Sequence, residues 1–251
     1  MHTYTEEEIV ELKACIKSPL YFITNYIKLE TLDGREIPID LSDIQKELLE
    51  FYETHQHSLS SIHRQAGQST LACAYLLWYV LFHSDKTVLI GSSNLRNARQ
   101  FIEIIRGFYN RIPKWLSVDQ DPCEWNKTNL SFMNNSKILS QSISPNTARG
   151  FAVSIMYIDD LSTVSPKIQE QFLQSVLPIL YLGGKTIINT LPSREDDTTN
   201  KIYHDGISGE GKFAVIVKPI ELDDPRVPLL REMLGEEIFD REYLCKWVKY
   251  G

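Results

Sequence analysis

The sequence predicts an α/β fold, in which helices flank both faces of a mostly parallel central sheet. From residue 58 onward, short apolar runs alternate with stretches of helical periodicity, and this order is typical of parallel sheets. Three of the apolar runs end in polar or charged residues, directly after Ile62, Ile158 and Ile188. Because ligands gather at the carboxyl ends of parallel strands, we expect these three strand ends to form one site.

Composition limits the classes of protein to which the chain can belong. Its 251 residues, 43% of them hydrophobic, suffice for one sizeable core. A net charge of -7 argues against a simple DNA-coating protein, because tight binding to the DNA backbone needs a concentrated positive surface. This net charge does not exclude a local basic face. The four cysteines lie far apart without zinc spacing, which favours reduced thiols in a cytosolic protein. The acidic start lacks a signal core, and the longest apolar run, 71–82, is too short to span a membrane.

The N-terminal part, residues 1–57, is predicted to be a small extension of the core. Residues 6–17 carry apolar side chains at helical spacing. In the stretch that follows, Asp33 and Gly34 offer a hairpin turn. The next segment has the apolar pattern of a helix, and Ser42 would cap its start.

The core is predicted over residues 58–220, and a C-terminal helical segment over 221–251, in which 226–249 is expected to be mainly helix. Strands alternate with helices in the core, and one hairpin is expected to turn at Asn134 and Asn135. The expected strands are 58–63, 86–93, 153–160, 185–192 and 212–222, the expected helices are 69–83, 94–112 and 165–180, and the hairpin covers 129–144.

The first candidate motif is the turn "RQAGQST", residues 64–70, between a predicted strand and a predicted helix. Gly67 would let the backbone approach an anionic ligand closely, and amides at the helix N-terminus would surround phosphate oxygens. The hydroxyl of Ser69 would ligate Mg²⁺. Since Ile62 stands where a phosphate loop has its first glycine, an ordinary strand–turn–helix junction is an equal interpretation of this stretch alone.

Two further strand ends carry polar chemistry. The apolar run "IMYIDD" ends in Asp159 and Asp160; the first carboxylate would hold Mg²⁺ through water and the second would polarise an attacking water. The alternative is a pair of aspartates that cap the next segment. In "INTLP", Asn189 and Thr190 would sense a γ-phosphate. The alternative is that the stretch is only a polar strand end before Pro192, and by itself this is the more common interpretation.

Two single residues complete the candidate set. Arg149 in "PNTARGF" would neutralise transition-state charge, on the nucleotide of a neighbouring subunit, or it is a solvated loop arginine. Gln45 precedes the phosphate-loop segment, and its amide would bond the edge of an adenine ring.

Together these motifs resemble the ATPase domain of the large terminase subunit, the DNA-packaging motor of tailed bacteriophages. That family has a glutamine ahead of the core, a deviant Walker A of the form RQxGK(S/T), a Walker B ending in IYIDE, and a threonine-rich coupling strand before a proline. Here Gln45, "RQAGQS", "MYIDD" and "INTLP" match them in order, with "SPLYFITNYIK", "EWNK" and "ARG" as further landmarks over residues 18–251. The resemblance implies a P-loop NTPase core of the RecA or ASCE type.

The resemblance also implies ATP and Mg²⁺ as cofactors and assigns a role to each candidate. Ser69 and Asp159 would handle Mg²⁺, Asp160 stands where the catalytic glutamate belongs, and Arg64 would reach toward the γ-phosphate. The implied catalytic residues are Asp160, Arg64 and Arg149, and the implied nucleotide-binding residues are Gln45, Arg64, Gln65, Ala66, Gly67, Gln68, Ser69, Thr70, Asn189 and Thr190.

The chain departs from the family pattern at two positions. Gln68 replaces the lysine that bridges the β- and γ-phosphates; a charge-assisted bond is worth roughly 1.5–3 kcal/mol, so binding is expected to weaken by about one to two powers of ten. Asp160 is shorter than glutamate by roughly 1.5 Å, and a misplacement of about 1 Å can lower a rate on the order of a hundredfold. We therefore expect the fold to survive with turnover reduced or lost, and Arg64 to be the substitute cation.

The resemblance further implies partners. These are double-stranded DNA moved into a prohead by the assembled motor, the portal protein, the small terminase subunit and other copies in a ring, in the cytoplasm of the infected bacterial host and without a membrane. The family's nuclease domain is expected beyond the ATPase domain, so this chain is not expected to cut DNA. The alternative is a catalytically impaired nucleotide-binding pseudo-ATPase that acts in assembly or regulation. A helicase-like ATPase would need a second RecA-like domain.

Overall fold

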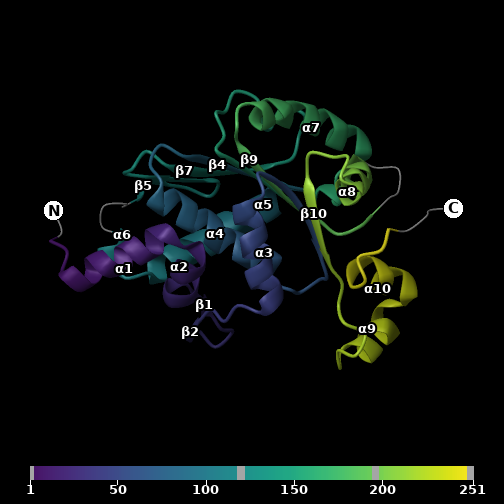
Figure 1. Cartoon of the computed structure of the whole chain (residues 1–251), viewed down its shortest axis with the longest axis horizontal. Coiled ribbons are helices and arrows are strands. Elements are labelled where there is room, and N and C mark those ends of the chain that lie inside the picture. The colour runs from purple at the N-terminus through teal and green to yellow at the C-terminus, as the bar shows by residue number, and fades with distance from the viewer. Residues whose placement is uncertain (1–2, 118–121, 194–197, 248–251) are drawn as a thin grey trace.

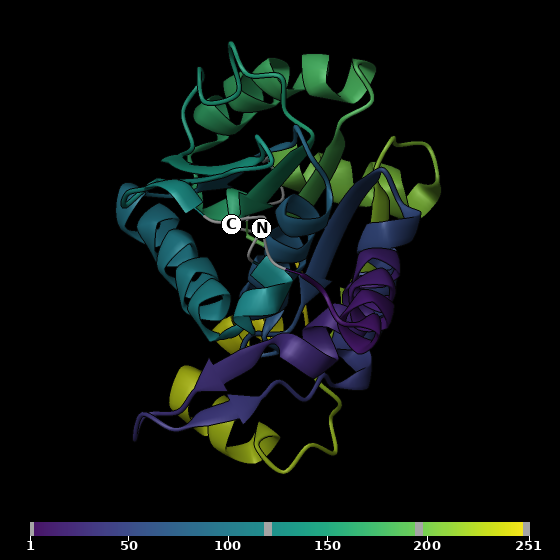
Figure 2. The same ribbon diagram turned by 90° about the vertical axis from the view of Figure 1, so that its left-hand side faces the viewer.

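A computed structural model describes residues 3–117, 122–193 and 198–247. It shows an eight-stranded sheet with helices on both faces, and a separate two-stranded hairpin (Figures 1 and 2). The predicted fold class, a mostly parallel sheet flanked by helices, is confirmed. None of the described helices is both long enough and apolar enough to cross a lipid bilayer.

The N-terminal elements begin where local capping chemistry predicts. They are α1 (Glu6–Lys17), α2 (Pro19–Tyr26), β1 (Lys28–Glu30), β2 (Glu36–Pro38) and α3 (Asp43–Thr54). A capping box between Ser42 and Gln45 opens α3, and the hairpin of β1 and β2 turns through Gly34 at φ 79°. The helix expected at 6–17, the hairpin turn and the Ser42 cap are thus confirmed, whereas α2 was not expected from its aromatic and β-branched composition.

The core elements follow in the alternating order that the sequence predicts. They are β3 (His57–Ile62), α4 (Gln68–Phe82), β4 (Thr87–Ser92), α5 (Leu95–Arg111), α6 (Lys114–Ser117), β5 (Pro122–Trp125), β6 (Asn129–Phe132), β7 (Lys137–Ser142), β8 (Ile155–Asp159), the 3₁₀ turn Leu161–Thr163, α7 (Pro166–Tyr181), β9 (Lys185–Asn189), α8 (Thr198–Ser208) and β10 (Ala214–Lys218). The sequence did not indicate α6, β5 or α8.

The C-terminal segment is mainly helical, as expected for 226–249. It contains α9 (Val227–Leu234) and α10 (Glu236–Glu242), and residues 243–247 are not helical. Residues 248–249 lie outside the described part. These helices have a small core of their own, made by Ile220, Val227, Phe239 and Tyr243, beyond the β10 edge of the sheet (Figure 1).

The strand order brings the three candidate strand ends together. The sheet runs β10-β3-β9-β8-β4-β7-β6-β5, and its first six strands are parallel. Strand β9 therefore lies between β3, which leads into the turn at 64–70, and β8, which ends in Asp159. In register, Asn189 of β9 is opposite Ser60 on one side and Asp159 on the other.

The strands β4, β8 and β9 are buried on both faces, which explains their nearly continuous apolar runs. Alternate strand residues pack on opposite faces: Tyr157 joins the core beneath α1 to α5, whereas its neighbours Met156 and Ile158 join the core beneath α7 and α8 (Figure 1). Residues from 1–57, such as Phe22 and Leu48, belong to the first of these cores. The proposed division at residues 57 and 220 stays a prediction.

Candidate functional site

The loop between β3 and α4 has the backbone shape of an anion-binding turn. Gln65 and Gly67 both have positive φ, 67° and 77°, and Gly67 is the N-cap of α4. A Cβ at Gly67 would lie 2.4 Å from the side-chain amide nitrogen of Gln45, which reinforces the preference for glycine. No side chain caps α4. The first amides of the helix, on Gln68, Ser69 and Thr70, are therefore available to an anion, which the helix dipole also favours.

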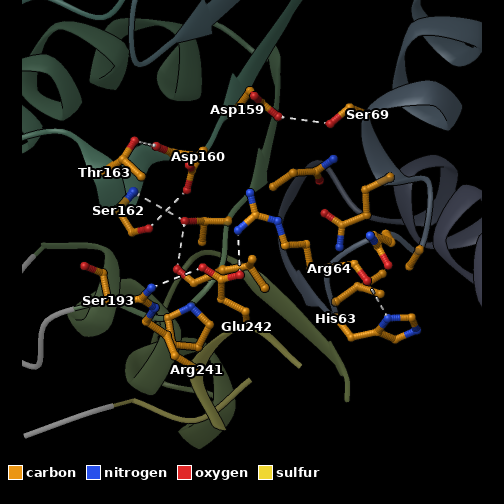
Figure 3. Close-up of a pocket in the computed structure, with 18 of the residues that line it drawn as sticks. His63, Arg64, Ser69, Asp159, Asp160, Ser162, Thr163, Ser193, Arg241 and Glu242 are labelled. Carbon is orange, nitrogen blue, oxygen red and sulfur yellow. Dashed lines mark hydrogen bonds and ion pairs between the residues drawn. The ribbon is translucent and has the colours of Figure 1, made fainter. Parts of the chain in front are cut away.

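The loop meets the carboxylate strand directly. The hydroxyl of Ser69, in the first turn of α4, donates to Oδ1 of Asp159 at 3.3 Å (Figure 3). Around this contact lies a cavity of about 580 Å³ whose lining comes from the loop, the ends of β8 and β9, and the end of α10. The lining residues are those of 62–70, Asp159, Asp160, Ser162, Thr163, those of 189–193, Arg241 and Glu242.

The two carboxylates at the end of β8 sit in a poorly solvated position. Burial, and then the charge of Asp160, raise the pKa of Asp159 to about 6, while hydrogen bonds from Ser69 and Tyr157 oppose that rise. Burial also raises the pKa of Asp160, against a hydrogen bond from Ser162. Asp160 has left-handed backbone angles, φ 54° and ψ 54°. A bound cation would stabilise two adjacent, half-buried carboxylates of this kind.

The side chains of Asn189 and Thr190 are engaged within the protein. Asn189 accepts a hydrogen bond from Tyr52 at 2.8 Å and donates one to Tyr157 at 2.9 Å. The hydroxyl of Thr190 accepts from the amide of Ser162 at 3.3 Å. Both residues are buried, and they tie the end of β9 to β8 and to the 3₁₀ turn behind it.

Arg64 is held by the C-terminal segment. Its guanidinium pairs with the carboxylate of Glu242 at 2.5 Å, and its amide donates to the Glu242 carbonyl at 2.8 Å (Figure 3). The hydrogen bond and the charge of Glu242 raise the pKa of Arg64. The cavity lining contains the arginines Arg64 and Arg241 and three carboxylates, so negative charge predominates where an anion is expected.

The two glutamines of the candidate set have different surroundings. Nε2 of Gln68 is buried and has no hydrogen-bond partner within the described residues. An unpaired buried donor costs about 1–3 kcal/mol, which a ligand oxygen would recover. Gln45, in contrast, accepts a hydrogen bond from the Ser42 amide at 3.0 Å and donates one to the Ala66 carbonyl at 3.1 Å. Its side-chain amide therefore holds the loop against α3. Gln45 also lines a second cavity of about 870 Å³ on the other side of the loop, which Gln65, Ala66 and Gly67 border too.

Arg149 lies apart from the other candidates. It lines a cavity of about 770 Å³ with Lys86, Ser154 and Gly184, which immediately precede β4, β8 and β9. These residues mark the edge of the sheet where the parallel strands begin, and the phosphate-loop cavity lies at the edge where they end. A strand of five or six residues separates its two ends by roughly 17–20 Å. Arg149 therefore does not approach the loop of its own chain.

The residues at the loop suit Mg²⁺ bound together with a nucleotide. Within the described part of the chain, no three His, Cys, Asp or Glu side chains gather in a way that could hold a metal ion by themselves. Magnesium in phosphate-transfer sites takes only one or two protein oxygens and completes its shell with water and phosphate oxygens. The hydroxyl of Ser69 and the carboxylate of Asp159 supply such a pair, at the N-terminus of a helix with no side-chain cap.

Several residues in and around the cavity were missed in the sequence. Ser162 and Thr163 follow the carboxylates after Leu161, and their position in the turn after a predicted strand could have revealed them. Tyr157 is two residues before Asp159 on a strand, a spacing that puts both side chains on one face. Glu242 has no such signal, because it is 178 residues from Arg64 in sequence.

The fold is shared with the ATPase domains of phage large terminases. No protein-family model matches the sequence. A single-residue mutant of the Thermus phage P74-26 large terminase ATPase domain is similar with a TM-score of 0.69 and 13% identity, over 92% of this chain and 99% of that chain. The HK97 bacteriophage large terminase is similar with a TM-score of 0.73 and 14% identity, over 92% of this chain and 55% of that chain.

A third similar structure is that of a large terminase with a bound nucleotide. It is the large terminase of the thermophilic bacteriophage D6E in complex with ADP, similar with a TM-score of 0.64 and 12% identity, over 83% of this chain and 54% of that chain. This chain therefore spans about half the length of the D6E and HK97 chains. Likeness at these identities shows the fold that the chains share.

Proposed function

We propose that this chain is the ATPase motor domain of a phage DNA-packaging terminase large subunit, which binds ATP with Mg²⁺ and drives double-stranded DNA into a prohead. The observation that carries the proposal is the 3.3 Å contact between Ser69 and Asp159 beside a left-handed glycine turn. It joins two segments 90 residues apart in the arrangement that a magnesium-bound triphosphate requires. The D6E large terminase, which shares this fold, forms complexes with ADP and with ATP-γ-S.

Different residues of the cavity contact different parts of the nucleotide and its cation. Backbone amides of Gln65 and of 67–70 surround the phosphates, and the free donor of Gln68 adds a neutral hydrogen bond where the terminase pattern has a charged one. Ser69 and Asp159 would hold Mg²⁺, which would neutralise phosphate charge. Asp160 accepts a proton from, or orients, the attacking water. The partners that follow are double-stranded DNA, a portal protein, a small terminase subunit and further copies of this chain, in the cytoplasm of an infected bacterium.

A second function remains open, that of a pseudo-ATPase which binds nucleotide for assembly or regulation. It is favoured by the pairing of Arg64 with Glu242, which keeps the expected substitute cation occupied, together with the uncharged Gln68. Without a cation close to the transferring phosphoryl group, the charge that develops in the reaction is poorly stabilised.

Calorimetry with ATP-γ-S and Mg²⁺ tests the nucleotide site that both functions share. We expect the wild-type chain to bind only when Mg²⁺ is present, and Ser69→Ala to lose at least about tenfold in affinity, because it removes a proposed metal ligand. Ser69→Thr is the matched control, since it keeps the hydroxyl and should bind like wild type. Failure of the wild-type chain to bind would contradict both functions.

Turnover then separates the two functions. Hydrolysis of ATP by the chain assembled with portal and small subunit supports the motor, whereas binding without hydrolysis in that assembly supports the pseudo-ATPase.

A further inference from the structure

A buried network of hydrogen bonds lies behind the carboxylate of Asp159. It joins four residues from four elements: Tyr52 of α3, Ser60 of β3, Asn189 of β9 and Tyr157 of β8. All four are buried, with at most 3% of each exposed. The network ends at Asp159, because the hydroxyl of Tyr157 donates to its Oδ1 at 3.3 Å.

The direction of each bond in this network is determined by its chemistry. The amide oxygen of Asn189 accepts from the hydroxyls of Tyr52 and Ser60, so its NH₂ group points to Tyr157 and donates at 2.9 Å. Since the Tyr157 oxygen accepts that bond, its own proton is free for Asp159. Tyr157 is thus held as a donor toward the carboxylate.

The two oxygens of Asp159 are used differently. Oδ1 accepts from both Ser69 and Tyr157, each at 3.3 Å, whereas Oδ2 has no protein partner within the described residues. Two donors on one oxygen fix the rotation of the carboxylate about its bond to Cβ. The second oxygen then remains for a cation.

We propose that Tyr157 is a positioning residue for the metal site: its hydroxyl sets the rotation of the Asp159 carboxylate that presents Oδ2 to the nucleotide-bound cation. This inference rests on the proposed function, because it concerns the cation that accompanies the nucleotide. The ring of Tyr157 packs against Phe101 with centroids 5.5 Å apart, and phenylalanine would keep that packing. Tyr157→Phe therefore removes the hydroxyl and leaves the core contact.

The experiment measures metal dependence rather than activity. Binding of a fluorescent ATP analogue is followed as Mg²⁺ is titrated, and Mn²⁺ binding is followed by electron paramagnetic resonance. In Tyr157→Phe we expect the half-saturating Mg²⁺ concentration to rise about tenfold, as loss of a partner that orients a metal ligand typically lowers metal affinity by about 10–100-fold. Nucleotide affinity at saturating Mg²⁺ should return close to the wild-type value.

Tyr52→Phe is the matched control. It deletes the hydroxyl of another fully buried tyrosine in the same network, but Tyr52 contacts Asn189 and not Asp159. Its metal dependence should stay within about twofold of wild type, since the bond between Tyr157 and Asp159 remains. Should Tyr157→Phe fold poorly, the metal titration is repeated well below the unfolding temperature of that variant, where the same metal shift is expected.

Three results would overturn the inference, and a fourth would support it. An unchanged metal dependence in Tyr157→Phe overturns it, and so does an equal shift in Tyr52→Phe, which would show a general loosening of the core. A wild-type chain that binds no nucleotide overturns the proposed function and this inference together. Wild-type binding with a specific metal shift in Tyr157→Phe supports both.

Discussion

Gln68 is an uncharged donor in a cavity where carboxylates outnumber arginines. Its unpaired Nε2 offers one hydrogen bond to a phosphate, but it cannot offset the charge of a triphosphate. A hydrogen bond to a charged group contributes roughly 1.5–3 kcal/mol, against about 0.5–1.5 kcal/mol for a neutral one. Position 68 should therefore control both nucleotide affinity and the charge balance of the site.

Gln68→Lys is expected to tighten binding of ATP-γ-S with Mg²⁺ by about tenfold, because the new ammonium group adds a charge-assisted bond. Combined with Asp160→Glu, it should raise ATP turnover, since the longer side chain recovers a displacement of roughly 1.5 Å. Calorimetry and a phosphate-release assay measure the two effects. Gln68→Met, which removes the donor without adding charge, is the control and should bind more weakly than wild type; equal affinity of Gln68→Lys and Gln68→Met would refute this account.

At the scale of residues, the sequence predicts a site when its members are adjacent along the chain or follow a strand. The turn at 64–70 and the pair Asp159 and Asp160 were found this way, and the structure brings them together. Glu242 and Tyr52 could not be found, because their partners Arg64 and Asn189 lie far away in sequence and only the folded chain makes them neighbours.

Among the elements, both α3 and α10 contact the phosphate loop from outside the sheet, α3 through Gln45 and α10 through Glu242. On the C-terminal side, Arg64 donates to the carboxylate and to the carbonyl of Glu242, and the Ile220 amide donates to the Tyr243 carbonyl. The Glu242 side chain is 14% exposed, whereas that of Arg64 is 59% exposed, so solvent screens the pair. The contact places a negative charge beside the anion site and keeps Arg64 from serving a phosphate.

Glu242→Gln is expected to tighten binding of ATP-γ-S with Mg²⁺ by about fivefold, corresponding to the ~1 kcal/mol that a partly exposed ion pair contributes. The variant removes one carboxylate and frees the Arg64 guanidinium, while the backbone bond to residue 242 remains. Glu236→Gln is the control: it breaks the ion pair of Glu236 with Arg231 at the other end of α10 and should leave affinity unchanged. Weaker binding in Glu242→Gln would show instead that α10 supports the loop.

The elements that escaped prediction share a lack of clear periodicity. Helix α2 is short and begins with Pro19, and its aromatic and β-branched residues resemble a strand. Strand β5 pairs irregularly with β6 at the edge of the sheet, so its residues are only partly buried and show no apolar alternation. In contrast, β4, β8 and β9 are buried on both faces, and their continuous apolar runs were read correctly.

At the scale of the whole molecule, the candidate residues lie at two opposite edges of the sheet, because all the strands around the site are parallel. The phosphate loop and the carboxylates lie where the strands end, and Arg149 lies where they begin. The sequence predicted strands and helices but not the order of the strands, which depends on packing between distant segments. For the same reason it could not say that Arg149 and Ser69 lie at opposite edges. A head-to-tail contact between copies would bring one edge to the other, as in a closed ring.

Arg149→Ala is therefore expected to leave nucleotide binding by a single chain unchanged and to lower ATP turnover only in the assembled state. The expected loss is on the order of a thousandfold, as for a transition-state arginine that a neighbouring subunit supplies. Mixing Arg149→Ala chains with Ser69→Ala chains provides the sharper measurement. The Ser69→Ala chain has an impaired site of its own but carries an intact Arg149, so it can complete the intact site of an Arg149→Ala neighbour. Recovery of turnover in the mixture supports a shared site. Weakened binding by the isolated Arg149→Ala chain would show that the arginine acts within its own subunit, which is contrary to its place at the opposite edge of the sheet.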